Sequence, residues 1–272
     1  MKLSADFEEF RSYLQEHKLS DNTITSYMGS VRLYGSLYTS VTTASAKKYR
    51  AFLIKNYKPA TVNQRICGFN HFLDYAGKPQ YKLPSVRLQK PSYLDAVISN
   101  KDYLLLKRRL RKNGPELWFY VVWFLGATGA RVSELLKFKV EHLSSGYMDM
   151  YTKGGKMRRI YIPDTLCSEA SAWCHRRGTP SGYLFVNRRG EPMTPRGVNY
   201  QLKHFARLYK INPDTVYPHS FRHRFAINFL QRFNDLALLA DLLGHNNVET
   251  TRIYLTRSTI EQQKMIDKIV TW

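Results

Sequence analysis

Apolar side chains recur three and four positions apart through residues 1–83, which is the period of a helix with one buried face. Ser20 stands before the second such series, and a serine there accepts a hydrogen bond from the first turn of a helix. Pro59 suits a first helical turn, where the missing amide hydrogen leaves no hydrogen bond unmade. The pattern predicts four helices in this segment. Its clearest apolar face is made by Leu3, Phe7, Phe10 and Leu14.

The helical period is lost over residues 84–95, where prolines and cations stand without a repeat. Such a composition favours an extended linker. Periodicity returns in KDYLLLKRRLRK and in PELWFYVVWFLGA, residues 101–112 and 115–127. The second of these is apolar on almost every face, and a helix of that kind is expected in the middle of a core. The sequence therefore predicts two domains, residues 1–83 and 96–272, joined by the linker.

A different pattern follows in YMDMYT, KGGK and MRRIYIP, which together are residues 147–163. Strand-forming residues on both sides of a glycine turn predict a β-hairpin. The chain then returns to helical patterns, with Asp164 and Thr194 as expected N-caps. The predicted fold class is mainly α with a small β-hairpin, an α+β arrangement.

The chain carries 42 lysines and arginines against 21 acidic residues, a formal charge of +21. Such an excess predicts a polyanionic partner, with nucleic acid ahead of a membrane surface. The longest apolar run, residues 117–127, is about half of the roughly 20 residues that span a bilayer. The N-terminal segment lacks the apolar core of a signal peptide, so we expect a cytoplasmic protein with no membrane partner.

The cysteines are few and widely separated. Cys67, Cys167 and Cys174 are spaced for neither a disulfide framework nor a zinc site. His175 beside Cys174 is the pairing that most suggests a metal, and no second close pair follows it. We therefore expect no metal and no other cofactor.

Two arginines, two histidines and a tyrosine in the second predicted domain suit a phosphodiester under nucleophilic attack. They are Arg131, His219, Arg222, His245 and Tyr254. Negative charge grows on the phosphate in the transition state, and guanidiniums stay charged while donating forked hydrogen bonds to it. A tyrosine oxygen can attack phosphorus when nearby cations favour its ionised form. His219 and Arg222 stand three positions apart and share one helix face, whereas His223 is expected to point about a quarter turn away.

The segments ATGARVSELL, PHSFRHRFA and LLGHNNVETTRIYL resemble the motifs of the tyrosine recombinase (phage integrase) family, of the Xer and integrase kind. The resemblance implies a SAM-like core-binding domain in residues 1–83. It implies the family's catalytic domain, with a C-terminal tail helix, in residues 96–272. The implied activity is site-specific recombination of double-stranded DNA at an inverted-repeat core site. A tyrosine joins the DNA 3′ phosphate and releases a 5′ hydroxyl, without metal or ATP.

The same resemblance assigns roles to the five residues. Tyr254 is the nucleophile, and it attacks a phosphate that Arg131 and Arg222 clamp. His219 matches the histidine that manages the tyrosine proton. His245 matches a position that donates a hydrogen bond and supports packing.

Three further assignments come from the resemblance. Lys153, in the predicted hairpin turn, matches the lysine that protonates the leaving 5′ oxygen, with Lys156 as the rival assignment. Glu134 matches an acidic residue that orients Arg131. The tail, residues 259–272, is expected to dock on a neighbouring protomer, giving a homotetramer on two DNA sites and a monomer when free.

Several alternatives stay open at this level. A type IB topoisomerase shares the chemistry but relaxes supercoils without exchanging strands, and a DNA-binding protein without catalysis shares the fold. Integration and excision of a mobile element, DNA inversion and dimer resolution all use the same machinery. An accessory directionality factor is compatible with each of them.

Overall fold

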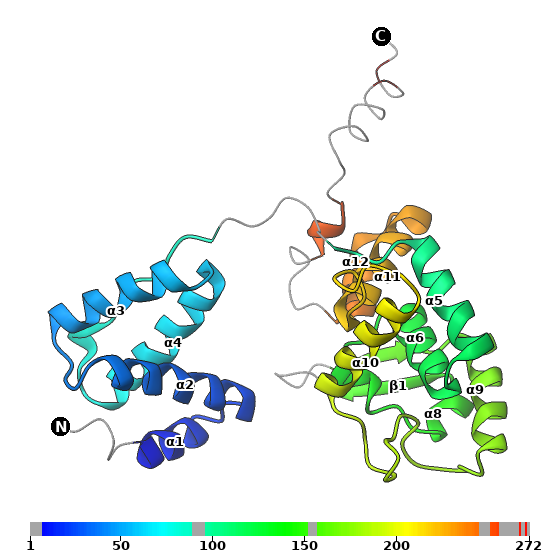
Figure 1. The fold of residues 1–272 in the computed structure, drawn as a ribbon, viewed down its shortest axis with the longest axis horizontal. Coiled ribbons are helices and arrows are strands. Elements are labelled where there is room, and N and C mark those ends of the chain that lie inside the picture. The colour runs from blue at the N-terminus through cyan, green and yellow to red at the C-terminus, as the bar shows by residue number, and fades with distance from the viewer. Residues whose placement is uncertain are drawn as a thin grey trace. The chain divides into compact units, whose positions relative to one another are not determined.

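The computed structural model describes residues 7–88, 96–151, 157–244, 251–255, 267 and 270. The chain divides into two compact units, Met1–Lys90 and Pro91–Trp272. Figure 1 shows both units as assemblies of helices, and the described residues add one two-stranded antiparallel sheet. The predicted fold class, mainly α with a small β-hairpin, is confirmed. Among the described residues, no helix is both long and apolar enough to cross a membrane.

The described part of the first unit contains four α-helices, as predicted. They are α1 (Phe7–Glu16), α2 (Asp21–Leu37), α3 (Thr43–Asn56) and α4 (Pro59–Tyr75), followed by the short 3₁₀ helix η1 (Pro79–Tyr81). Ser20 is the N-cap of α2, where its hydroxyl accepts a hydrogen bond from the Thr23 amide. Pro59 begins α4 as expected. Local capping therefore sets where these helices begin.

Aromatic rings fill the core of the first unit. The rings of Tyr34 and Phe69 stack with centroids 4.3 Å apart, and that of Tyr49 meets both at steeper angles. Gly68 lets α4 approach α2, because a Cβ there would lie 2.9 Å from the Oγ of Ser30. The close packing of α4 on α2 therefore requires glycine at position 68.

The segment after η1 is held on α4 by two asparagines. The Asn70 side chain exchanges two hydrogen bonds of 2.9 Å with the backbone of Leu83. Asn63 does the same with Val86, at 2.7 and 2.9 Å. The expected linker over residues 84–95 therefore begins with residues fixed to the first unit, while residues 89–95 lie outside the described part.

The second unit is built around α6 (Glu116–Thr128), which packs against neighbouring helices on several sides and is buried along most of its length. Those neighbours are α5 (Asn100–Asn113), α9 (Asp164–Arg176) and α11 (Pro218–Phe233). The almost uniformly apolar sequence of α6 follows from this position, because each face meets another apolar surface. Further helices within the described ranges are α7 (Val132–Leu135), α8 (Glu141–Ser145), α10 (Pro195–Leu208), α12 (Leu236–Leu243) and the 3₁₀ helix η3 (Arg252–Leu255).

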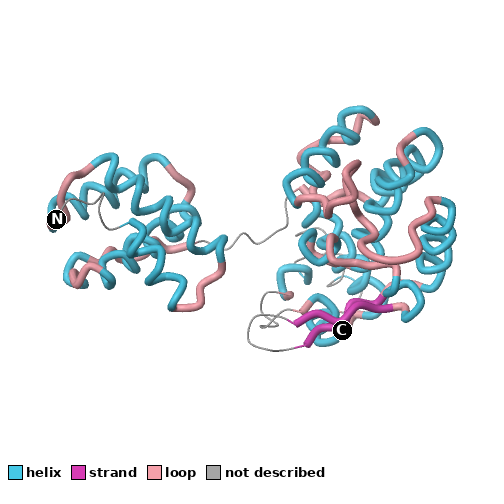
Figure 2. The backbone as a smooth tube through the Cα atoms, turned by 90° about the horizontal axis from the view of Figure 1, so that it is seen from below, coloured by secondary structure: helices cyan, strands magenta, loops and turns pink. Residues whose placement is uncertain are grey.

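The predicted hairpin is present as β1 (Tyr147–Tyr151) and β2 (Met157–Tyr161), paired with Met148 opposite Ile160. Figure 2 shows these strands at one edge of the second unit. Thr194 caps α10 as predicted, accepting a hydrogen bond from the Gly197 amide at 3.1 Å. The expectation for Asp164 was wrong by one residue, because Pro163 is the N-cap of α9 and Asp164 is its first helical residue.

Candidate active site

The turn after α6 places Arg131. Gly129 ends the helix in the left-handed conformation, with φ of 62°. A Cβ at this glycine would lie 2.7 Å from a ring carbon of Phe225, so both backbone conformation and space require glycine. The Thr128 hydroxyl accepts a hydrogen bond from the Ala130 amide at 3.2 Å. The chain then enters α7 with Arg131 as its N-cap.

Glu134 holds Arg131 by both its backbone and its side chain. One carboxylate oxygen accepts the Arg131 amide at 2.7 Å, and the other accepts Nη1 of the guanidinium at 2.8 Å. The Arg131 side chain is 34% exposed, whereas that of Glu134 is 8% exposed. Arg131 is thus oriented from beneath while its guanidinium remains accessible. The family resemblance implied such a contact between Glu134 and Arg131.

A third arginine, Arg158 of β2, completes the network, and the sequence analysis did not identify it. Its Nη1 donates to the same Glu134 oxygen at 2.6 Å, and its Nε donates to the carbonyl of Leu242 at 3.0 Å. The side chain is 2% exposed. Strand alternation was the available signal, because Arg158 shares a face with the buried Ile160.

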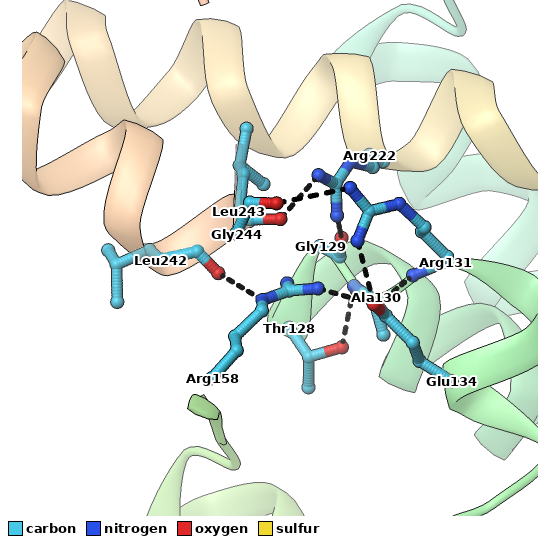
Figure 3. A network of polar contacts seen from close by, with 10 residues as sticks. All are labelled: Thr128, Gly129, Ala130, Arg131, Glu134, Arg158, Arg222, Leu242, Leu243 and Gly244. Carbon is cyan, nitrogen blue, oxygen red and sulfur yellow. Dashed lines mark hydrogen bonds and ion pairs between the residues drawn. The ribbon is translucent and has the colours of Figure 1, made fainter. Parts of the chain in front are cut away.

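The C-terminal end of α12 is held by these arginines (Figure 3). Arg158 binds the Leu242 carbonyl, Arg222 binds that of Leu243 at 2.6 Å, and Arg131 approaches that of Gly244 at 3.4 Å. The last carbonyls of a helix lack helical partners and carry its negative dipole end, so guanidiniums are favourable there. Three consecutive carbonyl groups therefore each accept from a different arginine. This fixes the backbone directly before residue 245.

Arg222, on α11, contacts both the turn after α6 and the C-terminal end of α12. Its Nη1 donates to the carbonyl of Gly129 at 2.9 Å, while its Nη2 makes the Leu243 contact. Burial, together with Arg131 and Arg158, lowers the pKa of the Arg222 guanidinium to about 10, which leaves it charged at neutral pH. Three guanidiniums around one carboxylate leave an excess of positive charge, which attracts an anion such as phosphate.

Glu134 stays ionised within this cluster. Burial by itself would raise the pKa of its carboxyl, but Arg158, and the hydrogen bonds and charge of Arg131, bring the pKa below its usual value. A charged carboxylate is the form that both arginines require, because it accepts hydrogen bonds from each of them.

Tyr254 lies in η3 against α11, the helix that carries His219 and Arg222. Burial raises the pKa of its phenol above the ordinary value, while the charges of Arg222 and Arg131 and a hydrogen bond from Arg222 act against the rise. The structure thus brings Tyr254 together with both predicted phosphate-binding arginines. Burial, Arg222 and Arg131 also lower the pKa of His219.

His223 makes a contact that the sequence analysis missed. Its Nδ1 lies 2.9 Å from the Tyr254 hydroxyl, within hydrogen-bonding distance. The expected direction, about a quarter turn from Arg222, left His223 without a role, but η3 lies beside α11 on the flank where His223 projects. A helical period gives the direction of a side chain, but it does not give the position of the next element.

Other expected site residues cannot be placed in the same way. Lys153, its rival Lys156 and His245 lie outside the described residues, and so does the tail except for residues 267 and 270. Their roles stay predictions. Within the described ranges, no group of three His, Cys, Asp or Glu side chains is arranged to hold a metal ion.

The site defines a class of protein. Its arginines can bind an anion, and a tyrosine hydroxyl and a histidine lie among them. Such a site suits transfer of a phosphodiester to tyrosine. Residues 117–260 match the sequence profile of the phage integrase family. The chain is 31% identical over 269 residues to tyrosine recombinase XerA of Pyrococcus furiosus, an alignment that covers 94% of this chain and 91% of that protein. This protein belongs to the phage integrase family of tyrosine recombinases.

Solved structures support the fold assignment. A transposon Tn1549 integrase in complex with transposon right-end DNA has a TM-score of 0.70 at 15% identity, over 100% of both chains. The XerH site-specific recombinase bound to difH substrate, before cleavage, has a TM-score of 0.69 at 17% identity, over 92% of this chain and 79% of that one. The arrangement of helices and hairpin is therefore that of tyrosine recombinases.

Proposed function

We propose that this site-specific recombinase cleaves and rejoins double-stranded DNA through a covalent bond between Tyr254 and the DNA 3′ phosphate. The observation that carries the proposal is the position of Tyr254 in η3, packed against α11, the helix that carries Arg222. The charges of Arg222 and Arg131 act on its phenol. A phosphate held by these two guanidiniums would bring phosphorus next to a nucleophilic oxygen.

The arginines act by electrostatic stabilisation. Arg222 is 3% exposed and held on both sides by carbonyl groups, so its guanidinium is oriented before DNA binds. Donors fixed in advance stabilise the growing charge of a transition state without reorganising during the reaction. Arg131, held by Glu134 and more exposed, would complete the clamp.

The remaining steps use residues whose roles are predictions. Lys153, or Lys156 in its place, would protonate the leaving 5′ oxygen. The resemblance assigns the tyrosine proton to His219 and a supporting hydrogen bond to His245. The phosphotyrosine bond keeps the energy of the broken phosphodiester, so attack by a second 5′ hydroxyl restores DNA without ATP. Which strand supplies that hydroxyl decides whether strands are exchanged.

The proposed partner is DNA with an inverted-repeat core site, bound by the first unit as well as by the catalytic unit. Two solved relatives are bound to transposon right-end DNA and to difH DNA, which supports a DNA partner here. We infer that the protein forms a homotetramer on two DNA sites and is a monomer when free. An accessory directionality factor is compatible with this assembly. The cytoplasmic location is inferred from the same DNA substrate.

Capture of covalent adducts tests the function. The protein is mixed with sheared DNA from its source, denatured, and adducts are purified and sequenced. We expect adducts clustered at one inverted repeat, lost in Tyr254→Phe and kept in Tyr200→Phe, a matched change at a tyrosine that is 71% exposed. Adducts scattered without a common sequence would contradict site specificity.

A plasmid carrying two copies of the recovered site then separates the two catalytic alternatives. A recombinase deletes or inverts the DNA between directly or inversely repeated copies. A topoisomerase relaxes the plasmid and leaves the order of the DNA unchanged, and this result would replace the recombinase assignment.

A further inference from the structure

His223 and Tyr254 meet through the imidazole edge and the phenol hydroxyl. Nδ1 stands 2.9 Å from the hydroxyl oxygen, and the rings are inclined by 51° with centroids 5.6 Å apart, so the contact is a hydrogen bond and not stacking. Within the described part of the chain, His219 has no hydrogen bond to Tyr254, and its ring centroid lies 6.4 Å from that of His223.

The phenol donates in this hydrogen bond when the ring carries its hydrogen on Nε2, which leaves Nδ1 as the acceptor. Burial, His219 and Arg222 lower the pKa of His223 to about 4, so the ring is neutral at neutral pH and one nitrogen accepts. Burial raises the pKa of Tyr254, so its hydroxyl keeps its hydrogen there. Arg222 acts on the same phenol and has only donors, so it can use one lone pair of the oxygen but not the phenol hydrogen. That hydrogen can point to Nδ1 of His223.

We propose that His223 accepts the Tyr254 proton during DNA cleavage and returns it during religation, a role that rests on the proposed function of the site. As the tyrosine oxygen bonds to phosphorus, its O–H bond breaks and the proton passes to Nδ1. The bond from phosphorus to the 5′ oxygen breaks, and that oxygen takes a proton from the general acid. In religation the 5′ hydroxyl gives its proton back to the deprotonated general acid and attacks phosphorus, the phosphotyrosine bond breaks, and the imidazolium returns its proton to the tyrosine oxygen.

Bound DNA supplies the charge that this transfer needs. In the empty site a protonated His223 would face the cation of Arg222 and the ring of His219, which disfavours a second positive charge. A phosphate between Arg131 and Arg222 brings a negative charge to the same place and offsets that repulsion. The phenol is therefore expected to lose its proton only after the phosphate has bound. In the free protein the tyrosine stays protonated and is a poor nucleophile.

The test uses a nicked suicide duplex carrying the recovered site, with adduct formation followed by gel in single turnover from acid to alkaline pH. His223→Asn places an amide oxygen near the position of Nδ1, so it keeps a hydrogen-bond acceptor but cannot hold a proton. His219→Asn tests the competing assignment with the same change. Circular dichroism and duplex binding confirm that each variant folds and binds.

A second substrate carries sulfur in place of the leaving 5′ oxygen. A thiolate leaves without protonation because a thiol has a pKa of about 8.5, so this substrate removes the need for the general acid and leaves the need for the base. Lys153→Ala serves as the control that sulfur is expected to rescue.

We expect His223→Asn to cleave about 10²–10⁴-fold more slowly than wild type on both substrates, the usual range for loss of a proton-transfer group. Its rate should rise with pH across the range, because hydroxide then removes the proton. A variant as fast as wild type, or one slowed equally at every pH, would overturn the proposal, as would this signature in His219→Asn instead. Absence of wild-type adduct, or an adduct that persists in Tyr254→Phe, would reject the proposed function and this inference with it.

Discussion

Arg158 and Arg159 are adjacent on β2, and both pair with carboxylates, yet their replacement by methionine should have very different consequences. Nη1 of Arg158 lies 2.6 Å from Glu134 with the arginine side chain 2% exposed. Nε of Arg159 lies 2.8 Å from Asp149 with the arginine side chain 38% exposed. The two pairs thus differ mainly in burial, which makes Arg159→Met a matched control for Arg158→Met.

The expected loss for Arg158→Met is about 3 kcal/mol in the free energy of unfolding. Removing one partner of a buried ion pair costs about 3–5 kcal/mol, because the other charge stays buried. Glu134 retains two hydrogen bonds to Arg131, which favours the lower end. Arg159→Met removes an exposed pair, and such pairs contribute about 0–1 kcal/mol.

Tryptophan fluorescence during urea unfolding measures the stability of the second unit, because all four tryptophans lie there. Glu134→Gln should partly rescue Arg158→Met, since it removes the stranded charge, and a double-mutant cycle gives the coupling. Equal losses in the two single variants would refute the claim that burial decides the effect.

Acid provides an independent check of the same reasoning. The folded-state pKa of Glu134 lies below its usual value, so the stability it contributes is present above the unfolded pKa of about 4.3 and lost as pH falls through the folded pKa. The gap between wild type and Arg158→Met should therefore narrow on acidification, because a protonated carboxyl no longer needs the cation. A gap that stays constant would contradict this account.

Three further predictions follow from the same contacts. Gly244→Ala should destabilise the second unit more than Gly146→Ala, since both glycines have positive φ but a Cβ at Gly244 would lie 2.3 Å from the Cδ of Arg158; equal thermal shifts would argue against the clash. Neutral His223 should contribute on the order of 2–3 kcal/mol to the free energy of unfolding. This contribution is present above pH 6.5 and lost as pH falls toward about 4, and His223→Asn should flatten this part of the curve of stability against pH. Arg222→Lys should slow cleavage far more than it weakens DNA binding, because one ammonium cannot hold both carbonyl oxygens and a phosphate; parallel losses would contradict this.

The helices and the hairpin were predictable because their signals are local. The even apolar character of α6 indicated its central position, and Thr194 marked the start of α10. Arg131, Arg222 and Glu134 were proposed from motif positions in the family resemblance. These features depend on residues a few positions apart.

The missed residues depend on contacts between distant segments. Arg158 meets Glu134 across 24 positions and Leu242 across 84, and strand alternation gives the face without naming either partner. His223 stands about 100° around the helix from Arg222, and only the position of η3 turns that direction into a contact with Tyr254. Local periodicity contains neither piece of information.

The most direct test of the central claim is to identify the amino acid that joins DNA. Adducts from the nicked duplex are digested with trypsin and nuclease, and the modified peptide is sequenced by mass spectrometry. The account predicts a nucleotide on residues 253–257, a tryptic peptide whose one tyrosine is Tyr254, attached through the 3′ phosphate. A nucleotide on any other peptide, or attachment through a 5′ phosphate, would contradict it.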